Sequence, residues 1–164
     1  MNLRTRLGLT QAELGDLLGV SQPAVSAWEA GRRTPTGGSA RFFARLRAAE
    51  HGPVRSYGWF RAREIELPAA WWEPVVDRGA TVRLPIHLEW TPRAASARDL
   101  ADPVQRSATY AKVLDAGEPF DVRVWIDPGQ LVAAWPDLPV ARHLVASVAD
   151  LVATLKAARV SVDG

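Results

Sequence analysis

Apolar residues recur at helical spacing near the N-terminus, between residues that start and stop helices. Three leucines between residues 14 and 18 follow a capping box, Thr10-Gln-Ala-Glu13. In such a box the threonine oxygen accepts from the backbone N–H of the glutamate, and the carboxylate accepts from the backbone N–H of the threonine. Gly19 is typical of the left-handed residue that ends a helix. The pattern predicts a short amphipathic helix between Thr10 and Gly19.

A second helix start follows directly. Ser21 suits an N-cap, and Pro23 fits a first turn, where its missing N–H would be unpaired in any case. Val25 and Trp28 give this helix one apolar face, with Trp28 in the core, and Gly31 ends it. The two predicted helices are therefore short and joined by a sharp turn.

Further helices flank this pair. Leu3 and Leu7 are four residues apart and predict a very short helix at the start of the chain. Residues 32–38 form a loop rich in Gly, Pro and Thr, after which Ser39 starts another helix. The core side of that helix contains Phe42, Phe43 and Leu46.

The composition changes after about residue 50. Six of the seven tryptophans follow residue 58, and the segment HGPVRSYG at 51–58 is typical of a linker or a domain edge. We therefore predict an N-terminal domain at 1–52, a linker or edge segment at 53–80 and a C-terminal domain at 81–164.

The C-terminal part mixes strand-like and helix-like patterns. Residues 81–90 alternate apolar and polar positions like a strand, in which Pro85 indicates an edge or a bulge. Residues 120–127 also alternate, but a short helix fits them equally well. The predicted fold class is mainly α, with a mixed α/β or mostly helical C-terminal domain. Its helical patterns cover residues 99–114, 130–135 and 142–158.

Composition narrows the class of protein. Hydrophobic residues make up 48% of the 164, which predicts a folded core. The chain contains no cysteine, so disulfides and thiolate metal sites are excluded. The N-terminus lacks the apolar run of a signal peptide, and no segment approaches about 18 uninterrupted apolar residues. We expect a soluble, cytoplasmic protein that makes no contact with a membrane.

Charge is distributed unevenly along the chain. Residues 1–55 contain eight Arg or Lys and four Asp or Glu, a net +4, whereas the remainder carries −2, which together give the +2 of the chain. A basic N-terminal third indicates a polyanionic partner for that third, and a chance imbalance on a solvated surface is the alternative.

Two capped helices joined at a glycine make a helix-turn-helix unit, whose second helix is set forward to enter the major groove of DNA. Readout of base edges needs small or hydrogen-bonding side chains on that helix. Glutamine pairs bidentately with adenine, serine is adaptable, and alanine or proline contacts a thymine methyl group. The candidate groove-facing residues are Ser21, Gln22, Pro23, Ser26 and Ala27.

Other residues of the unit are candidates for positioning the DNA backbone. Gln11, at the start of the first helix of the pair, is placed to hold a phosphate together with the helix N-terminus. Arg32 and Arg33 follow the second helix and would add phosphate contacts. Glu29 is interpreted as the structural partner of a nearby arginine. The alternative to DNA binding is a plain αα-hairpin, which would not require a polar groove face.

The segment LTQAELGDLLGVSQPAVSAWEAGRRTP at 9–35 resembles the Cro/C1-type (XRE, lambda-repressor-like) helix-turn-helix family, and the resemblance covers residues 1–50. It implies a bundle of four or five helices that binds double-stranded DNA as a homodimer, with Gln11 on a phosphate and Gln22, Pro23 and Ser26 facing the bases. Departures from the family pattern are the short first helix, a glycine at Gly15 in place of the usual alanine, and Pro23 itself.

Two finer resemblances concern the biological role. The segment WEAGRRTPTG at 28–37, with the short start of the chain, is similar to HigA-like antitoxin repressors. Residues 83–152, beginning with LPIHLEW at 84–90, resemble the tail of proteins encoded beside nucleotidyltransferase-like (AbiEii-type) toxins. The second resemblance implies that this region faces a cognate toxin.

Tryptophans provide candidates for a partner contact. Trp71 and Trp72 are adjacent, and neighbours on one element do not easily both point inward. Ordinary core packing is the alternative for these two and for the other C-terminal tryptophans.

The sequence offers no catalytic, metal or cofactor site. His51, His87 and His143 are far apart and lack acidic or cysteine partners at metal-ligand spacing, and His87 is interpreted as a half-buried or edge histidine. The acidic residues are scattered at helix starts and turns, and no phosphate loop or nucleophile elbow is present. We predict that the protein is not an enzyme.

These patterns predict a transcriptional repressor, and the resemblances imply the autoregulating antitoxin of a toxin–antitoxin pair. A stand-alone regulator whose C-terminal domain senses a small ligand is the alternative. An interaction adaptor with a degenerate helix-turn-helix is the third class.

Overall fold

The computed structural model of the chain describes residues 3–90 and 97–162. The fold is mainly α with a smaller mixed C-terminal part, which confirms the predicted class. The N-terminal part consists of α1 (Leu3–Arg6), α2 (Gln11–Leu18), α3 (Gln22–Glu29) and α4 (Gly37–His51).

The helix pair α2–α3 has the predicted turn and the predicted capping box at the start of α2. The backbone N–H of Glu13 donates to Thr10 Oγ1 at 3.2 Å and that of Thr10 donates to Glu13 Oε2 at 2.7 Å, which confirms the capping box. Gly19 is left-handed at φ +67° and ends α2. Ser21 is the N-cap of α3 in extended conformation, but its side chain makes no capping hydrogen bond.

Gly15 lets α2 approach the turn closely. A Cβ atom at this position would lie 2.7 Å from the carbonyl oxygen of Val20, which is closer than van der Waals contact allows. The glycine therefore brings α2 and the start of α3 closer together than a side chain would, which offsets its poor helix propensity. Beneath the turn, the buried core of this bundle contains Leu14, Val25, Phe42 and Leu46.

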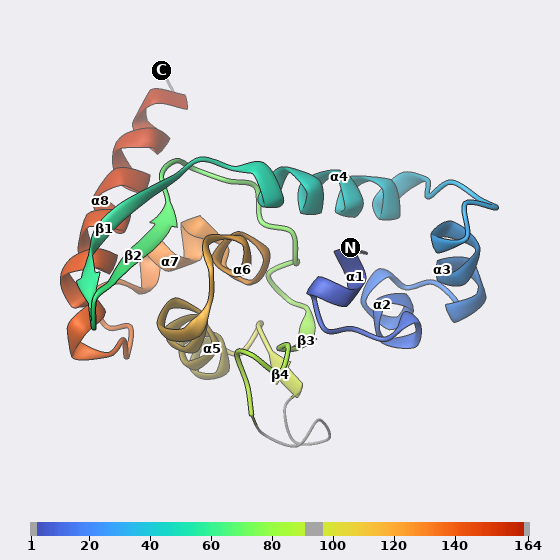
Figure 1. Cartoon of the computed structure of the whole chain (residues 1–164), viewed down its shortest axis with the longest axis horizontal. Helices are drawn as coiled ribbons and strands as arrows, with labels where there is room; N and C mark the ends of the chain where they lie inside the picture. Colours follow the sequence, from blue (N-terminus) through green and yellow to red (C-terminus); the bar gives the residue numbers. More distant parts are fainter. Residues whose placement is uncertain (1–2, 91–96, 163–164) are drawn as a thin grey trace.

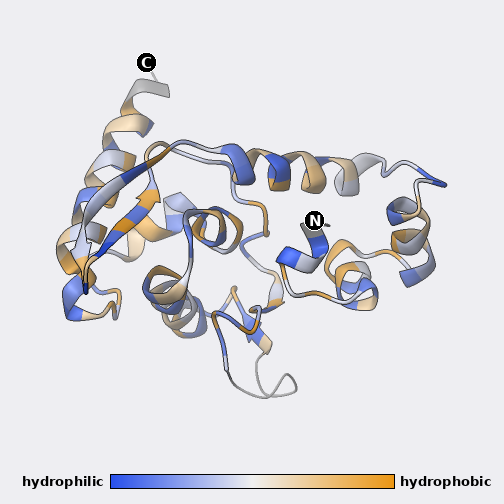
Figure 2. Cartoon of the chain, in the orientation of Figure 1, coloured by the Kyte–Doolittle hydropathy of each residue, from blue (hydrophilic) through white to orange (hydrophobic). Residues whose placement is uncertain are grey.

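Helix α4 connects the N-terminal half, with α1 to α3, to the C-terminal half, which begins at residue 54 (Figure 1). It runs from the helix-turn-helix to a two-stranded antiparallel hairpin of β1 (Val54–Phe60) and β2 (Arg63–Pro68), which packs on α8 (Val145–Val162). Figure 2 shows polar and apolar residues alternating along β2. Where the sequence predicts a linker or edge at 53–80, the structure has this hairpin.

The remaining elements surround one helix. The small sheet of β3 (Thr81–Arg83) and β4 (Ala97–Asp99) leads to α5 (Pro103–Ala116), α6 (Pro119–Trp125) and α7 (Pro128–Ala134), and the short 3-10 helix η2 (Arg142–Leu144) precedes α8. The strand predicted at 81–90 is shorter than expected. Pro85 has no N–H for a ladder, and its carbonyl accepts from Leu88 and Glu89 in a turn instead.

Helix α6 lies at the centre of the C-terminal half and settles the ambiguity at 120–127. Residues 120–125 are all buried, so this helix has no polar face to reveal its period. It contacts α4, α5 and β2. Pro119 occupies its first turn, and the Asp121 carboxylate accepts from the backbone N–H of Glu118 at 2.9 Å.

Two arginines join the halves. Arg123 of α6, 3% exposed, donates to the carbonyl oxygen of Ala49 in the last turn of α4 at 3.2 Å and also to that of Pro53. Arg6 pairs with Glu50 at 3.0 Å, and its guanidinium lies 3.9 Å from the centre of the Phe120 ring. The C-terminal end of α4 is thereby held by side chains from both halves.

Candidate nucleic-acid interface

Helix α3 presents its first turn to solvent. Ser21, Gln22 and Pro23 are exposed, whereas Val25 is fully buried against the bundle. Ser26 and Ala27 are half-buried on the same helix. The structure thus brings the five candidate base-facing residues together along one short helix, and the burial of Val25 fixes which side of α3 remains accessible.

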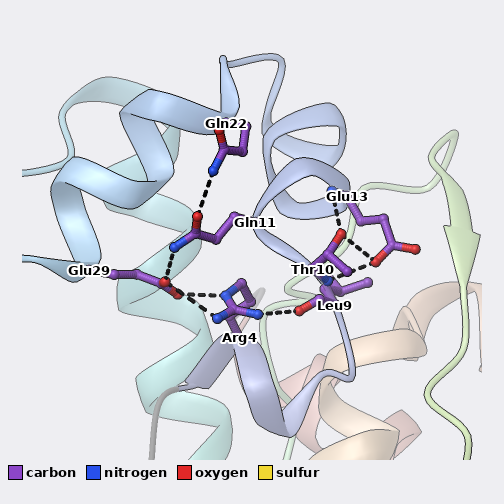
Figure 3. Close-up of polar contacts among 7 residues, drawn as sticks. All are labelled: Arg4, Leu9, Thr10, Gln11, Glu13, Gln22 and Glu29. Atoms are coloured by element: carbon purple, nitrogen blue, oxygen red, sulfur yellow. Dashed lines mark hydrogen bonds and ion pairs between the residues drawn. The ribbon is translucent and has the colours of Figure 1, made fainter.

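A chain of side-chain hydrogen bonds links the starts of α2 and α3 (Figure 3). Gln22 Nε2 donates to Gln11 Oε1 at 2.7 Å, and Gln11 Nε2 donates to Glu29 Oε2 at 2.7 Å. Gln11 and Gln22 each occupy the first position of a helix, so both amides lie beside free backbone N–H groups. The predicted phosphate-contacting and base-facing glutamines therefore form one unit.

Glu29 anchors this unit from the end of α3. Its Oε1 accepts from Arg4 Nε at 2.6 Å, which confirms that Glu29 pairs with an arginine. Arg4 Nη1 also donates to the carbonyl oxygen of Leu9 at 2.6 Å, just before α2. Sequence reasoning did not identify Arg4 as part of the site, because no local pattern connects residues 25 positions apart.

The two arginines after α3 stay in solvent. The backbone N–H groups of Arg32 and Arg33 donate to the carbonyl oxygen of Ala27 at 2.9 and 3.2 Å, which folds the chain back on the end of the helix. Both residues are exposed. They therefore supply positive charge near α3 that no ion pair within the described residues neutralises.

The candidate partner residues Trp71 and Trp72 occupy different environments. Trp72 is 7% exposed, and its indole Nε1 donates to the carbonyl oxygen of Ile126 at 2.9 Å. Trp71 is half-buried against the same core. Because Trp72 is buried, it is not available for the partner contact that the sequence predicted.

Two histidines each lie close to one carboxylate. His87 Nε2 lies 3.1 Å from Asp121 Oδ2, with the His87 side chain about half exposed, and His143 Nε2 lies 3.5 Å from Asp115 Oδ1. Within residues 3–90 and 97–162, no group of three or more metal-ligating side chains comes together. No helix of this part of the chain is long and apolar enough to cross a bilayer.

One of the three comparisons with known proteins agrees with this geometry. The comparisons with curated proteins and with solved structures returned no match. Residues 1–46 match the helix-turn-helix family, and this match covers α1, α2 and α3 and the first part of α4; Gln11 lies on α2, and Gln22 and Glu29 lie on α3. The match supports an N-terminal helix-turn-helix of the XRE, Cro/C1 type and a DNA-binding transcription regulator.

Proposed function

We propose that the protein is a sequence-specific repressor that binds double-stranded DNA as a homodimer. The observation that carries the proposal is the hydrogen bond between Gln22 and Gln11 at the exposed starts of α3 and α2. Each protomer would place α3 in the major groove, with two half-sites about 34 Å apart along one face of the duplex. Bound across a promoter, such a dimer excludes polymerase.

The donor and acceptor count of the two amides fits this role. Gln22 uses one N–H on Gln11 and keeps one N–H and its carbonyl oxygen. That pair is the set that binds N7 and N6 of adenine. Gln11 uses its oxygen and one N–H within the protein and keeps one N–H for a phosphate. Gln11 would therefore hold the base-reading amide in place while it contacts the backbone.

Selection of duplexes from a random library tests this function. The wild type and the variants Gln22→Ala and Ser26→Ala would be compared at two salt concentrations. We expect a palindromic motif for the wild type, altered base preference at particular positions for each variant, and binding that weakens with salt. Arg159→Ala, on the exposed part of α8, serves as the control. No enrichment by the wild type at low salt would refute the repressor function.

For the biological role we propose an autoregulating antitoxin whose C-terminal half engages a nucleotidyltransferase-like toxin. The support is the resemblance at 83–152 together with large apolar side chains that this half exposes. Tryptophan is enriched at protein–protein interfaces. The exposed side chains include Trp59 at 68%, Ile86 at 75% and Trp90 at 87% exposure.

Co-expression tests the antitoxin role. A co-oriented neighbouring gene for a nucleotidyltransferase would be expressed alone and together with this protein. Rescue of growth by the wild type, with weaker rescue by Trp59→Ser or Trp90→Ser, is the expected result. Equal toxicity with and without the protein would contradict the role and favour the alternative, a regulator that senses a small ligand.

A further inference from the structure

A cavity of about 410 Å³ lies between the helix-turn-helix and the C-terminal half. On one side it is lined by α2 and the residue before its cap, and on the other by β3 and the start of β4, with Trp125 of α6 also in its wall. Cavities of this volume hold small organic molecules.

The wall combines apolar surface with carboxylates. Leu9, Leu17 and Val82 provide apolar contacts, and Glu13 and Asp16 of α2 provide two acidic groups. The only basic group of the described lining is Arg83, whose Nη1 lies 3.6 Å from Glu13 Oε1. Within the described lining, one guanidinium stands against two carboxylates, so these residues carry a net negative charge.

Two polar groups of the lining have no partner within the described residues. The Asp16 side chain, which is exposed to solvent, makes no hydrogen bond or ion pair there, and it borders the cavity from the middle of α2. Trp125 is 2% exposed, and its indole Nε1 is buried without an acceptor. A buried N–H that lacks an acceptor is destabilising, but this nitrogen is closed off from the cavity, so the exposed Asp16 carboxylate is the group that a ligand can reach.

We propose that this cavity binds a small organic amine, with its ammonium group on Asp16 and its apolar body against Leu17 and Val82. A carboxylate ligand is disfavoured because Arg83 already faces Glu13 and the remaining charge is negative. The proposal extends the proposed function by giving the DNA-binding unit a chemical signal.

The same cavity is connected to the DNA-binding amides. Glu13 Oε2 accepts from the backbone N–H of Thr10 at 2.7 Å and from Thr10 Oγ1 at 2.8 Å, while Oε1 faces Arg83. Thr10 immediately precedes Gln11. A ligand that shifts Glu13 or Arg83 therefore changes the cap that positions Gln11, and binding of the amine alters affinity for DNA.

Calorimetry with three probes of one shape tests the site without DNA. The probes are 4-phenylbutylamine, 4-phenylbutanol and 4-phenylbutyrate, which carry a cation, a neutral hydroxyl and an anion on the same body. We expect the amine to bind with a Kd below about 1 mM and at least about tenfold more tightly than the other two. Asp16→Asn should remove this preference, whereas Asp150→Asn on the exposed part of α8 should keep it.

Equal binding of the three probes, or no heat from the amine at about 5 mM, would overturn the proposed site. An unchanged preference in Asp16→Asn would overturn the role of that carboxylate. Circular dichroism of both variants checks that each is folded.

Titration of a fluorescent duplex then tests the connection to DNA. The amine should change the Kd for DNA at least about threefold in the wild type and leave it unchanged in Asp16→Asn. An amine that binds in the calorimeter but leaves this Kd unchanged would overturn the regulatory part. If no duplex is bound at all, the proposed repressor function fails, and calorimetry still decides the amine site.

Discussion

Gln22 Nε2 lies 2.7 Å from Gln11 Oε1, so the first residue of α3 and the first residue of α2 share one hydrogen bond. The bond holds the rotamer of Gln22, the proposed base-reading residue, through Gln11, the proposed phosphate contact. In the proposed complex, base contact and backbone contact would therefore not be independent.

A double-mutant cycle with Gln11→Ala and Gln22→Ala measures that dependence. We expect each single change to weaken binding to the selected operator, and the double change to cost about 0.5–3 kcal/mol less than the sum, because the shared hydrogen bond is lost only once. Fluorescence anisotropy with a labelled operator gives the four dissociation constants.

Arg33→Ala is the contrasting partner in this cycle, because its exposed side chain has no described contact with either glutamine. Its effect should add to that of Gln22→Ala within about 0.5 kcal/mol. Additive effects for Gln11 and Gln22 themselves would contradict a shared unit.

Arg123→Met tests the contact between α6 and α4. The change leaves the carbonyl oxygens of Ala49 and Pro53 without their buried donor, although it also removes a buried charge. We expect the free energy of unfolding to fall by about 2–4 kcal/mol. Urea unfolding followed by tryptophan fluorescence and by circular dichroism measures it.

Arg47→Met is the matched control, because Arg47 lies exposed on α4. Its effect should stay within about 0.5 kcal/mol. If the two variants unfold alike, the Arg123 contacts contribute little to stability.

Two glycines of the N-terminal bundle should respond to alanine with opposite signs. Gly19 has φ +67° and open space around it, so Gly19→Ala strains the backbone at the end of α2 and should lower the free energy of unfolding by about 1 kcal/mol. Gly38 lies in α4 without a positive φ and also in open space. Gly38→Ala should therefore raise the free energy of unfolding by up to about 1 kcal/mol.

Thermal and urea unfolding of both glycine variants gives the two signs. Gly19→Asn should recover part of the loss, because asparagine tolerates the left-handed region. A neutral Gly19→Ala would show that the turn does not depend on this backbone conformation.

Tyr110 predicts a loss of stability in alkaline solution. Its hydroxyl donates to Gln130 Oε1 at 2.8 Å and accepts from the backbone N–H of Asp127, and burial raises the pKa of Tyr110 from 10.0 to about 12. The protonated phenol therefore stabilises the fold fully below pH 10.0, and this contribution is lost as the pH rises towards about 12. The shift corresponds to about 2–3 kcal/mol.

Urea unfolding across this pH range measures the loss, and Tyr110→Phe provides the comparison. In Tyr110→Phe, the free energy of unfolding should fall less steeply with pH, because the Tyr110 hydroxyl no longer titrates. Identical slopes for the two proteins would show that the hydroxyl titrates alike in the folded and unfolded chains.

Local chemistry explains what the sequence predicted well. The capping box of Thr10 and Glu13 and the left-handed Gly19 depend on neighbours only a few residues apart, so their structure follows from the sequence around them. The spacing that carries the helix-turn-helix is local in the same sense. The pairing of Glu29 with an arginine was predicted, but its partner Arg4 was not.

The sequence was ambiguous or wrong where tertiary packing decides. Residues 120–127 alternate like a strand and fitted a short helix equally well; the structure has a helix there, started by Pro119 and the carboxylate of Asp121, and burial on all sides removes the polar face that shows a helical period. The hairpin at 54–68 was missed because its stability comes from α8 and α6. Trp72 was predicted to contact a partner, but its indole N–H donates to the carbonyl oxygen of Ile126, 54 positions away.

The contact between α6 and the last turn of α4 also affects the design of fusion proteins that use part of this chain. A chimera that carries only residues 1–52 would lose the donors for the Ala49 carbonyl and the ring on which Arg6 lies. We therefore expect residues 1–52 alone to be less stable than the same residues within the full chain. Helix α4 is continuous over 15 residues, about 22 Å. A protein fused to the β1–β2 hairpin would therefore be held at a fixed distance and orientation from the helix-turn-helix.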